Sequence, residues 1–258
     1  MRRIEASAVS LKKVKEETFL LSFKSSYIAQ KASPGQFLHL RIDPLRLLLR
    51  RPLSIHRIEG QKIDILFRLR GKGTRKLSLT KKGDTLDILG PLGRGFNYTD
   101  KNIQGKVKIL VAGGMGVAPL FFLAQKLTAY RDVLVLLGAA TKKEILCKKD
   151  FQKLGCKVLI ATEDGSLGFK GRVTVLLKHL LTTQYSALST VIYACGPTEM
   201  LFSLRPILKT APRAVCQVSF EQFMGCGIGV CRACVIKTAK GYRRICKEGP
   251  VFDIKDIS

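Results

Sequence analysis

The sequence has few acidic residues and no run of five or six like charges. Its 258 residues include 19 aspartates and glutamates against 45 lysines and arginines, a formal net charge of +26. Such an excess is typical of proteins that bind nucleic acid or an anionic surface. Basic doublets such as Lys12-Lys13 and Lys142-Lys143 are separated by apolar runs, however, as solvated side chains at the ends of strands and helices would be. We interpret the charge first as a basic surface, second as a surface for an acidic protein partner, and only third as nucleic-acid binding.

Long apolar segments are missing as well. The longest apolar run, 109–124, is broken by three glycines and a proline, and a membrane-spanning helix needs about 20 apolar residues. Residues 1–5 contain no apolar leader, and the chain has eight cysteines. Both features favour a reducing compartment in which thiols stay free to bind metal. We expect a cytoplasmic protein that does not contact the membrane.

The sequence also lacks the side-chain groupings of nucleophilic or acid–base catalysis. His39, His56 and His179 are isolated, and no Ser-His-Asp or paired-carboxylate arrangement stands out. We therefore expect no catalytic side chain. Hydride and electron transfer need none, because cofactors carry that chemistry.

Four cysteines near the C-terminus form the most specific motif. Cys226, Cys231 and Cys234 are spaced with four and then two residues between them, and Cys246 follows after eleven more. Glycines between them permit tight turns whose N–H groups point at sulfur. The spacing C-x4-C-x2-C…C is typical of a plant-type [2Fe-2S] cluster. A zinc site with four cysteine ligands is the alternative, which the four-residue gap and the single downstream cysteine disfavour.

The residue pattern divides the chain into parts of different fold. Short β-rich runs near 18–23, 36–42 and 62–69 are separated by turns and predict an antiparallel barrel or sandwich over 1–103. Buried-type strands near 107–111, 132–138, 157–161 and 190–194 then alternate with helical patterns, which predicts a parallel sheet over 104–215. Residues 216–258 carry the cysteine motif and form a third, small domain.

Two glycine-containing turns of the middle region are candidates for nucleotide binding. The first follows a strand and contains Gly113, Gly114, Gly116 and Pro119, so its backbone and the next helix could accept a pyrophosphate. It is not a G-x-G-x-x-G sequence, and tight strand-to-helix packing is the alternative. The second, Cys195-Gly196-Pro197, ends the fourth strand, where Cys195 could face a nicotinamide or be a buried packing residue. Glu163 and Asp164 could accept hydrogen bonds from ribose, or form an ordinary acidic turn.

Basic residues beside turns of the first region are weaker candidates. Arginines can pair with phosphate through two hydrogen bonds, and a Gly-Lys-Gly-Thr turn offers further donors. In so basic a chain such residues are often merely solvated. The residues concerned are Arg51, Pro52, Leu53 and Ser54, then Arg68, Leu69 and Arg70, and then Gly73 and Thr74.

Taken in order, these motifs resemble those of a known family. The motifs concerned are Arg51–Ser54, Gly73-Thr74, Gly90–Phe96, the Gly113–Pro119 turn, Cys195–Pro197 and the cysteine tail through Asp253. Together they are similar to those of the electron-transfer subunit of NAD-dependent dihydroorotate dehydrogenase. That family belongs to the ferredoxin-reductase-like superfamily. The resemblance covers nearly the whole chain, and the tail is its most specific part.

The resemblance implies a flavin-binding barrel, a nicotinamide-binding α/β domain and a C-terminal [2Fe-2S] domain. Arg51–Ser54 would hold the flavin ring and ribityl region, and Arg68–Arg70 with Gly73-Thr74 the FAD phosphates. NAD would bind over Gly113–Pro119 and Cys195–Thr198, and the cluster would sit on Cys226, Cys231, Cys234 and Cys246. The subunit would carry electrons between NAD and the FMN of a separate catalytic subunit, as part of a cytoplasmic heterotetramer in pyrimidine biosynthesis, with physiological flow from dihydroorotate towards NAD.

Two other functions remain as alternatives. The first is the NAD(P)H-oxidising subunit of a related hydrogenase or transhydrogenase complex, which would share the flavin and nucleotide motifs but serve another acceptor. The second, from a different class, is a non-enzymatic basic module with zinc in its tail and nucleic acid as its ligand. A colourless, zinc-loaded protein whose DNA binding falls steeply with salt would identify the second.

Overall fold

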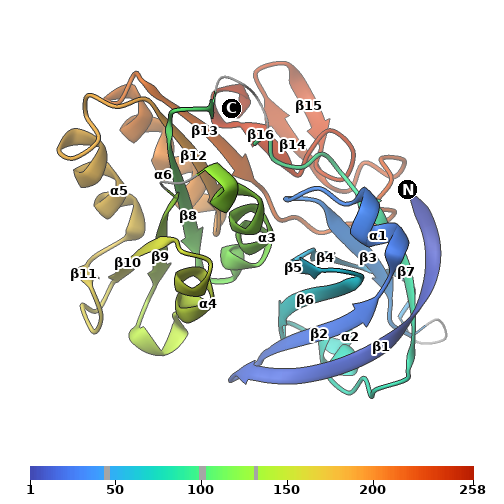
Figure 1. Ribbon diagram of the computed structural model, residues 1–258. Coiled ribbons are helices and arrows are strands. Elements are labelled where there is room, and N and C mark those ends of the chain that lie inside the picture. Colours follow the sequence, from blue (N-terminus) through green and yellow to red (C-terminus); the bar gives the residue numbers. More distant parts are fainter. Residues whose placement is uncertain (44–46, 99–102, 131–132) are drawn as a thin grey trace. The chain divides into compact units, whose positions relative to one another are not determined.

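The computed structural model describes residues 1–43, 47–98, 103–130 and 133–258, which form two compact units (Figure 1). The first unit contains Met1–Gly95, Gln222–Ile236 and Tyr242–Pro250, and the second contains Phe96–Glu221, Lys237–Gly241 and Val251–Ser258. The chain after Glu221 is therefore shared between the units, although the sequence predicts one domain over 216–258. The division into three functional domains stays a prediction.

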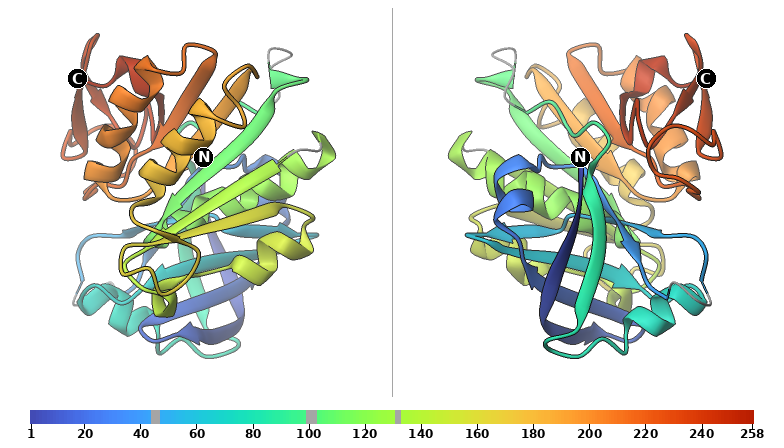
Figure 2. Two further views of the ribbon diagram at one scale, coloured as in Figure 1. Left: turned by 90° about the vertical axis from the view of Figure 1, so that its left-hand side faces the viewer. Right: turned by 90° about the vertical axis from the view of Figure 1, so that its right-hand side faces the viewer.

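The first unit is built on a seven-stranded antiparallel sheet in the order β4-β3-β7-β1-β2-β6-β5. β1 and β7 run side by side along its middle (Figure 2). The strands are β1 (Arg2–Lys15), β2 (Thr18–Lys24), β3 (Phe37–Arg41), β4 (Arg51–Ser54), β5 (Arg57–Glu59), β6 (Lys62–Arg68) and β7 (Thr85–Leu92). β2, β3 and β6 lie where the alternating pattern predicts strands.

This sheet curls round on itself. β4 and β5 stand at its opposite ends, yet only Ile55 and His56 separate them in the chain. A sheet whose end strands are consecutive in sequence must bend until its edges approach. Fully buried side chains such as Leu21, Phe23 and Ile65 fill its interior. The barrel architecture predicted from the sequence is confirmed.

Two short helices in the barrel unit were not predicted. α1 (Ser26–Lys31) is capped by Ser25, whose Oγ accepts a hydrogen bond from the N–H of Ile28 at 3.2 Å. α2 (Lys72–Leu77) has Gly71 as its N-cap residue. Each is six residues long, which is too short for the 3.6-residue period to stand out in the sequence.

The second unit contains a mainly parallel sheet in the order β11-β10-β9-β8-β12-β13-β16. Its strands carry near-continuous apolar runs because both faces are covered. They are β8 (Val107–Gly113), β9 (Val133–Ala139), β10 (Lys157–Thr162), β11 (Phe169–Lys170), β12 (Thr190–Cys195), β13 (Ala214–Ser219) and β16 (Val251–Asp253). Asp132, where the sequence predicts the second strand to begin, lies outside the described residues. The predicted boundary at 215 falls inside β13, and β16 adds an antiparallel edge strand.

Helices lie on the two faces of this sheet (Figure 1). α3 and α4 share one face, where Phe121 and Phe151 meet at 5.1 Å between ring centroids. α5 and α6 cover the other face. Their bounds are α3 (Val117–Leu127), α4 (Lys148–Lys153), α5 (Val173–Thr182) and α6 (Thr198–Lys209), and short 3-10 turns occur at Gly114–Gly116, Thr128–Tyr130, Lys142–Glu144 and Ile254–Asp256. Among the described residues, no helix is long and apolar enough to cross a membrane.

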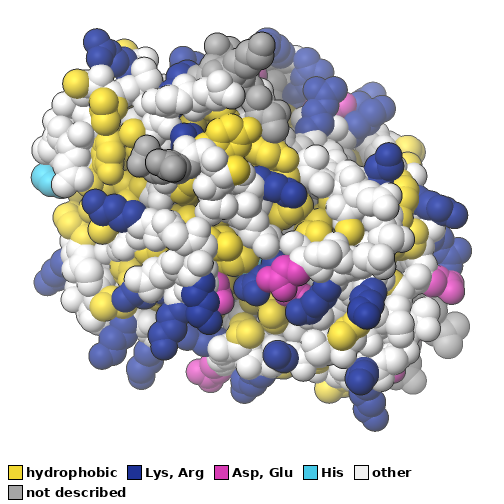
Figure 3. Space-filling view, in the orientation of Figure 1, with side chains coloured by type: hydrophobic (Ala, Val, Ile, Leu, Met, Phe, Trp, Pro, Cys, Tyr) yellow, Lys and Arg dark blue, Asp and Glu magenta, His cyan; other side chains and the backbone are white. Residues whose placement is uncertain are grey.

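The remaining strands, β14 (Val235–Thr238) and β15 (Gly241–Arg244), pair as a two-stranded sheet in the cysteine-rich tail. Lys and Arg side chains are scattered over the visible face of the molecule, with few acidic groups between them (Figure 3). On this face the basic side chains are therefore spread out rather than gathered into one stripe.

Candidate cluster and nucleotide sites

The four cysteines predicted to bind a cluster lie in the first unit as two pairs. The N–H groups of Cys226 and Cys231 each point to the sulfur of the other residue at 3.4 Å. The N–H of Cys246 donates to the sulfur of Cys234, also at 3.4 Å. Within the described residues, no three His, Cys, Asp or Glu side chains converge on a single metal position. Two thiol pairs suit a group with two metal centres, each held by two sulfurs.

The two pairs differ in their surroundings. Burial raises the pKa of the Cys226 thiol, but N–H groups of Cys231, Ile228 and Val230 outweigh burial and lower this pKa to about 6. Burial, with the adjoining Cys234 thiol, raises the pKa of Cys246 to about 12. The loop itself thus prepares Cys226 as a thiolate, whereas Cys246 needs the positive charge of bound metal to ionise.

The cysteine loop is seated on the barrel at His39, a fully buried residue of β3. Gly227 has a φ of +71°, and a Cβ added to it would collide with the imidazole. Among the described residues, neither ring nitrogen of His39 forms a hydrogen bond of standard geometry. Burial, reinforced by the charge of Arg50, lowers the pKa of His39 to about 4. The backbone of Arg50 and of Cys226 acts on this pKa in the opposite direction, so the imidazole that seats the loop faces backbone groups of both the barrel and the loop.

A second contact fixes the end of the tail to the barrel. The N–H of Arg94 donates to the carbonyl of Gly249 at 2.5 Å. Gly93 packs against the same segment, where an added Cβ would collide with Pro250 and Gly249. The Gly90–Phe96 motif that contributes to the family resemblance therefore supports the segment just after the last cysteine.

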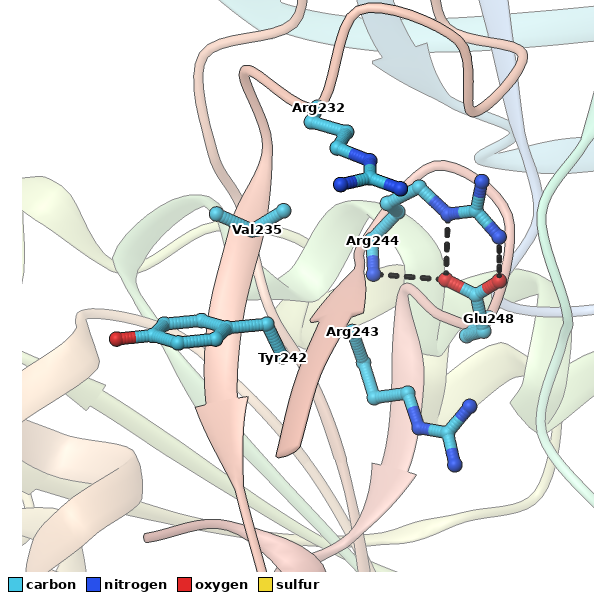
Figure 4. A pocket seen from close by; sticks show the side chains of 6 residues that line it. All are labelled: Arg232, Val235, Tyr242, Arg243, Arg244 and Glu248. Carbon is cyan, nitrogen blue, oxygen red and sulfur yellow. Dashed lines mark hydrogen bonds and ion pairs between the residues drawn. The ribbon is translucent and has the colours of Figure 1, made fainter. Parts of the chain in front are cut away.

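Beside the loop lies a pocket of about 230 Å³ (Figure 4). Arg244 and Glu248 form an ion pair in its wall, at 2.5 Å. Hydrogen bonds from Arg244 lower the pKa of Glu248 to about 2. Its lining residues are Arg232, Val235, Tyr242, Arg243, Arg244 and Glu248.

The residues predicted to hold FAD come from separate segments that meet in the first unit. A Cβ added to Gly73 would collide with the guanidinium of Arg51, so this arginine lies against the start of α2. The hydroxyl of Thr74 accepts a hydrogen bond from the N–H of Arg70 at 2.8 Å. All four residues of β4 are half-buried, and β4 is an edge strand. The structure thus brings Arg51 and the Arg70–Thr74 turn together.

Arg50 anchors the strand that carries this arginine. Its guanidinium pairs with the carboxylate of Asp87 at 2.8 Å and donates to the carbonyls of Asp87 at 3.1 Å and His39 at 3.3 Å. Three contacts hold the guanidinium across β3 and β7, directly before β4 begins. No local sequence pattern indicates this anchor, because Asp87 lies 37 residues from Arg50.

The two turns predicted to bind NAD meet in the second unit. Ala112 of β8 is in register with Cys195 of β12, so both turns lie at the carboxyl ends of neighbouring parallel strands. A Cβ on Gly116 would collide with the carbonyl of Cys195, and one on Gly113 with Pro197 and Met200. The order of the strands reverses between β8 and β12, and such a switch point is where doubly wound sheets bind nucleotides.

Two further candidate residues, Cys195 and Asp164, have close contacts within the second unit. Cys195 is fully buried, and burial raises the pKa of its thiol. The carboxylate of Asp164 accepts hydrogen bonds from the N–H and hydroxyl of Ser166 at 2.9 and 2.6 Å, which lower the pKa of Asp164. Asp164 thus lies in an acidic turn with Ser166, and its role in ribose binding stays a prediction.

Comparisons with known proteins identify the chain. Residues 221–258 match the iron–sulfur cluster binding domain of dihydroorotate dehydrogenase B, and residues 110–205 match the oxidoreductase NAD-binding domain. A curated relative from Desulforamulus reducens, the electron transfer subunit of dihydroorotate dehydrogenase B (NAD(+)), is 41% identical over 96% of this chain and 95% of its own. The chain belongs to the family of dihydroorotate dehydrogenase B electron transfer subunits.

Other relatives of this electron transfer subunit family agree. The protein of the same name from Caldanaerobacter subterraneus is 36% identical over 99% of this chain and 98% of its own. A solved NADH-dependent reduced ferredoxin–NADP oxidoreductase, studied for flavin-based electron bifurcation, has 28% identity and a TM-score of 0.86 over 98% of this chain and 89% of its own. These matches confirm the predicted family, the mixed β and α/β fold class, and the function of an NAD-linked oxidoreductase subunit that binds an iron–sulfur cluster.

Proposed function

We propose that the chain carries electrons between NAD and a separate dihydroorotate dehydrogenase catalytic subunit, using FAD on the barrel and a [2Fe-2S] cluster on the cysteine loop. The observation that carries this proposal is the arrangement of the four cysteines as two pairs, in each of which sulfur accepts backbone N–H groups. When bound, the flavin accepts a hydride and releases electrons singly, as transfer between a nicotinamide and a cluster requires. The remaining roles fall to the chain's own residues.

The cysteine loop would hold the cluster, with Cys226 and Cys231 on one iron and Cys234 and Cys246 on the other. Cys234 and Cys246 are 1% and 3% exposed, so this pair lies away from water. Cys231 is exposed and lies on the side from which another protein could approach. The loop thus has a protected inner pair and an accessible outer pair.

The edge strand β4 would hold FAD. The flavin ring and ribityl chain would contact Arg51, Pro52, Leu53 and Ser54. The guanidinium of Arg51 packs against Gly73, and at this position it is suited to pair with a phosphate. The other proposed phosphate-binding residues are Arg68, Leu69, Arg70 and Thr74.

NAD would bind at the switch point of the second unit. Two turns would approach the NAD molecule through their backbones. One contains Gly113, Gly114, Gly116 and Pro119, and the other contains Cys195, Gly196 and Pro197. The close packing of Gly116 on Cys195 holds the two turns together. Because the Cys195 thiol is fully buried, this residue would take part through its backbone.

The catalytic partner would dock on a cluster-edge patch that we define as Phe223, Ile228, Val230, Tyr242 and Arg243. Phe223 is 93% exposed, and Val230 and Tyr242 are each 75% exposed. Ile228 and Val230 stand between two cluster cysteines, so a protein that covers them comes close to the cluster. Exposed aromatic and apolar residues with an arginine are typical of protein interfaces. The proposed occupant is the FMN-containing catalytic subunit, in a cytoplasmic heterotetramer of pyrimidine biosynthesis that passes electrons from dihydroorotate to NAD.

A second candidate is a different acceptor subunit. The similarity to the NADH-dependent reduced ferredoxin–NADP oxidoreductase extends over 98% of this chain, so a related multi-subunit complex could use the same architecture. The nature of the partner separates the two candidates.

The test is reconstitution with candidate partners. The chain is mixed anaerobically with a dihydroorotate dehydrogenase B catalytic subunit or with subunits of related complexes, and dihydroorotate-dependent NAD reduction is followed. Only the first mixture should turn over. Cys234→Ser should abolish this turnover but retain NADH-dependent dye reduction at the flavin, whereas Cys147→Ser, which keeps all four ligands, should resemble the wild type. Turnover with another partner alone would replace the proposal by the second candidate.

A further inference from the structure

Arg244 and Glu248 form a closed ion pair around the segment that carries Cys246. The guanidinium Nη2 donates to Oε1 of Glu248 at 2.5 Å and its Nε to Oε2 at 3.0 Å. The backbone N–H of Arg244 donates to the same Oε2 at 2.7 Å, and all three bonds are drawn in Figure 4. A guanidinium held by two parallel bonds has a fixed orientation.

The third nitrogen of this guanidinium bonds to the loop that contains Cys226 and Cys231. Nη1 of Arg244 donates to the carbonyl of Gly229 at 2.7 Å. Gly229 lies between Cys226 and Cys231, fifteen residues away along the chain. A single side chain therefore ties the loop with the first cysteines to the strand that leads to the last.

The peptide unit whose carbonyl accepts a hydrogen bond from Arg244 also donates one, through its N–H, to the sulfur of a predicted cluster ligand. The carbonyl of Gly229 and the N–H of Val230 belong to the same planar peptide unit and point in opposite directions. That N–H donates to the sulfur of Cys226 at 3.3 Å. Holding the carbonyl outward directs the N–H inward, and a bond to the carbonyl also polarises the peptide and strengthens its donor.

Glycine is suited to this position. Gly229 has a φ of +86°, and a Cβ on it would collide with the side chain of Lys247. The peptide can therefore adopt the orientation that Arg244 requires, at a position where other residues would be strained.

We infer that Arg244, locked by Glu248, is a positioning residue that aims the Val230 N–H at the Cys226 sulfur and thereby raises the reduction potential of the cluster. A hydrogen bond to a ligand sulfur favours the more negative, reduced state of a cluster. Glu248 neutralises the charge of Arg244, so the effect acts through geometry rather than through net charge. This inference rests on the proposed function, because it needs a cluster on the four cysteines.

The test uses Arg244→Lys, which keeps the charge, and Glu248→Gln, which keeps Arg244 but releases it. The matched control is Lys12→Gln, which removes an exposed positive charge on β1 and leaves the Arg244 bonds intact. Cluster potential is measured by anaerobic redox titration followed by electron paramagnetic resonance, together with iron, sulfide and flavin content. Arg244→Lys should lower the potential, by about 59 mV for a tenfold shift of the one-electron equilibrium. Glu248→Gln should lower it less, because the uncompensated charge of Arg244 acts in the opposite direction. The control should stay at the wild-type value.

A variant that loses its cluster but retains flavin also supports the inference, because the barrel is then still folded. An unchanged potential in Arg244→Lys would overturn it, as would an equal shift in Lys12→Gln. Loss of both flavin and cluster from both variants would overturn it too, since the pair would then be a support of the whole unit. Wild-type protein without any cluster would instead defeat the proposed function.

Discussion

The backbone of Gly227 packs directly against the imidazole of His39. No space remains for a Cβ, and the φ of +71° lies in the left-handed region. This contact seats the cysteine loop on the barrel, because His39 belongs to the central part of β3 and Gly227 follows the first cluster cysteine. The position of the loop therefore depends on a glycine and a histidine that are remote in sequence.

Gly227→Ala should displace the loop. We expect loss of most of the bound iron and sulfide, with flavin retained, from a collision with His39 added to a left-handed strain of about 1–2 kcal/mol. Gly83→Ala is the control, since Gly83 has a φ of +93° but open space around it. The double variant Gly227→Ala with His39→Ala should recover part of the cluster. Full cluster content in Gly227→Ala would show that the loop does not depend on this contact.

Arg232 offers a test of charge alone. It lies next to Cys231, and its side chain extends into the pocket beside Arg244 (Figure 4). A nearby cation favours the more negative reduced cluster, so Arg232→Gln should lower the cluster potential without loss of iron. Lys12→Gln, which removes an exposed charge on β1, should not. An unchanged potential in Arg232→Gln would remove the idea that this arginine tunes the cluster.

The cluster-edge patch predicts a loss of assembly. Val230→Asp and Tyr242→Asp should each weaken binding to the catalytic subunit at least tenfold, about 1.4 kcal/mol, because a charge would be buried at an apolar contact. NADH-dependent dye reduction should not change. Leu79→Asp, at a residue 68% exposed elsewhere in the first unit, is the control. Surface plasmon resonance measures the binding, and wild-type affinity in both patch variants would place the partner on another face.

The Arg50–Asp87 pair predicts a pH dependence. Burial raises the pKa of Asp87, but hydrogen bonds with Arg3 and Arg50 outweigh it and hold the pKa below the ordinary value of 3.8. The carboxylate therefore stabilises the fold above about pH 4, and this contribution is lost as the pH falls through the lower folded pKa. Asp87→Asn should lower the free energy of unfolding at pH 7 by about 1 kcal/mol after screening by solvent.

This difference between wild type and Asp87→Asn should shrink below pH 4. Chemical denaturation across the pH range measures it. A difference that grows as the pH falls would contradict the assigned role of the carboxylate.

The sequence predicts features that depend on neighbours in the chain. The spacing of Cys226 and Cys231 is local, and the alternation in β2, β3 and β6 reports burial on a pleated strand. The apolar runs of β8 and β12 likewise reveal strands covered on both faces. For these elements, local pattern and tertiary structure agree.

Features that depend on distant contacts escape such reasoning. Nothing near His39 indicates that a loop from the end of the chain covers it, and the bond from Arg244 to Gly229 arises only after folding. β13 was divided by the predicted boundary at 215, because its alternation of exposed and buried residues does not resemble the apolar runs of the other parallel strands. β16 is only three residues long, and this segment is a strand only because it pairs with β13.

The central claim is that one chain holds the nicotinamide, flavin and cluster sites of an electron relay. Anaerobically purified protein should contain about one FAD, two irons and two acid-labile sulfides per chain, and addition of NADH should produce the electron paramagnetic resonance signal of a reduced [2Fe-2S] cluster. Protein that contains neither flavin nor acid-labile sulfide would contradict this claim.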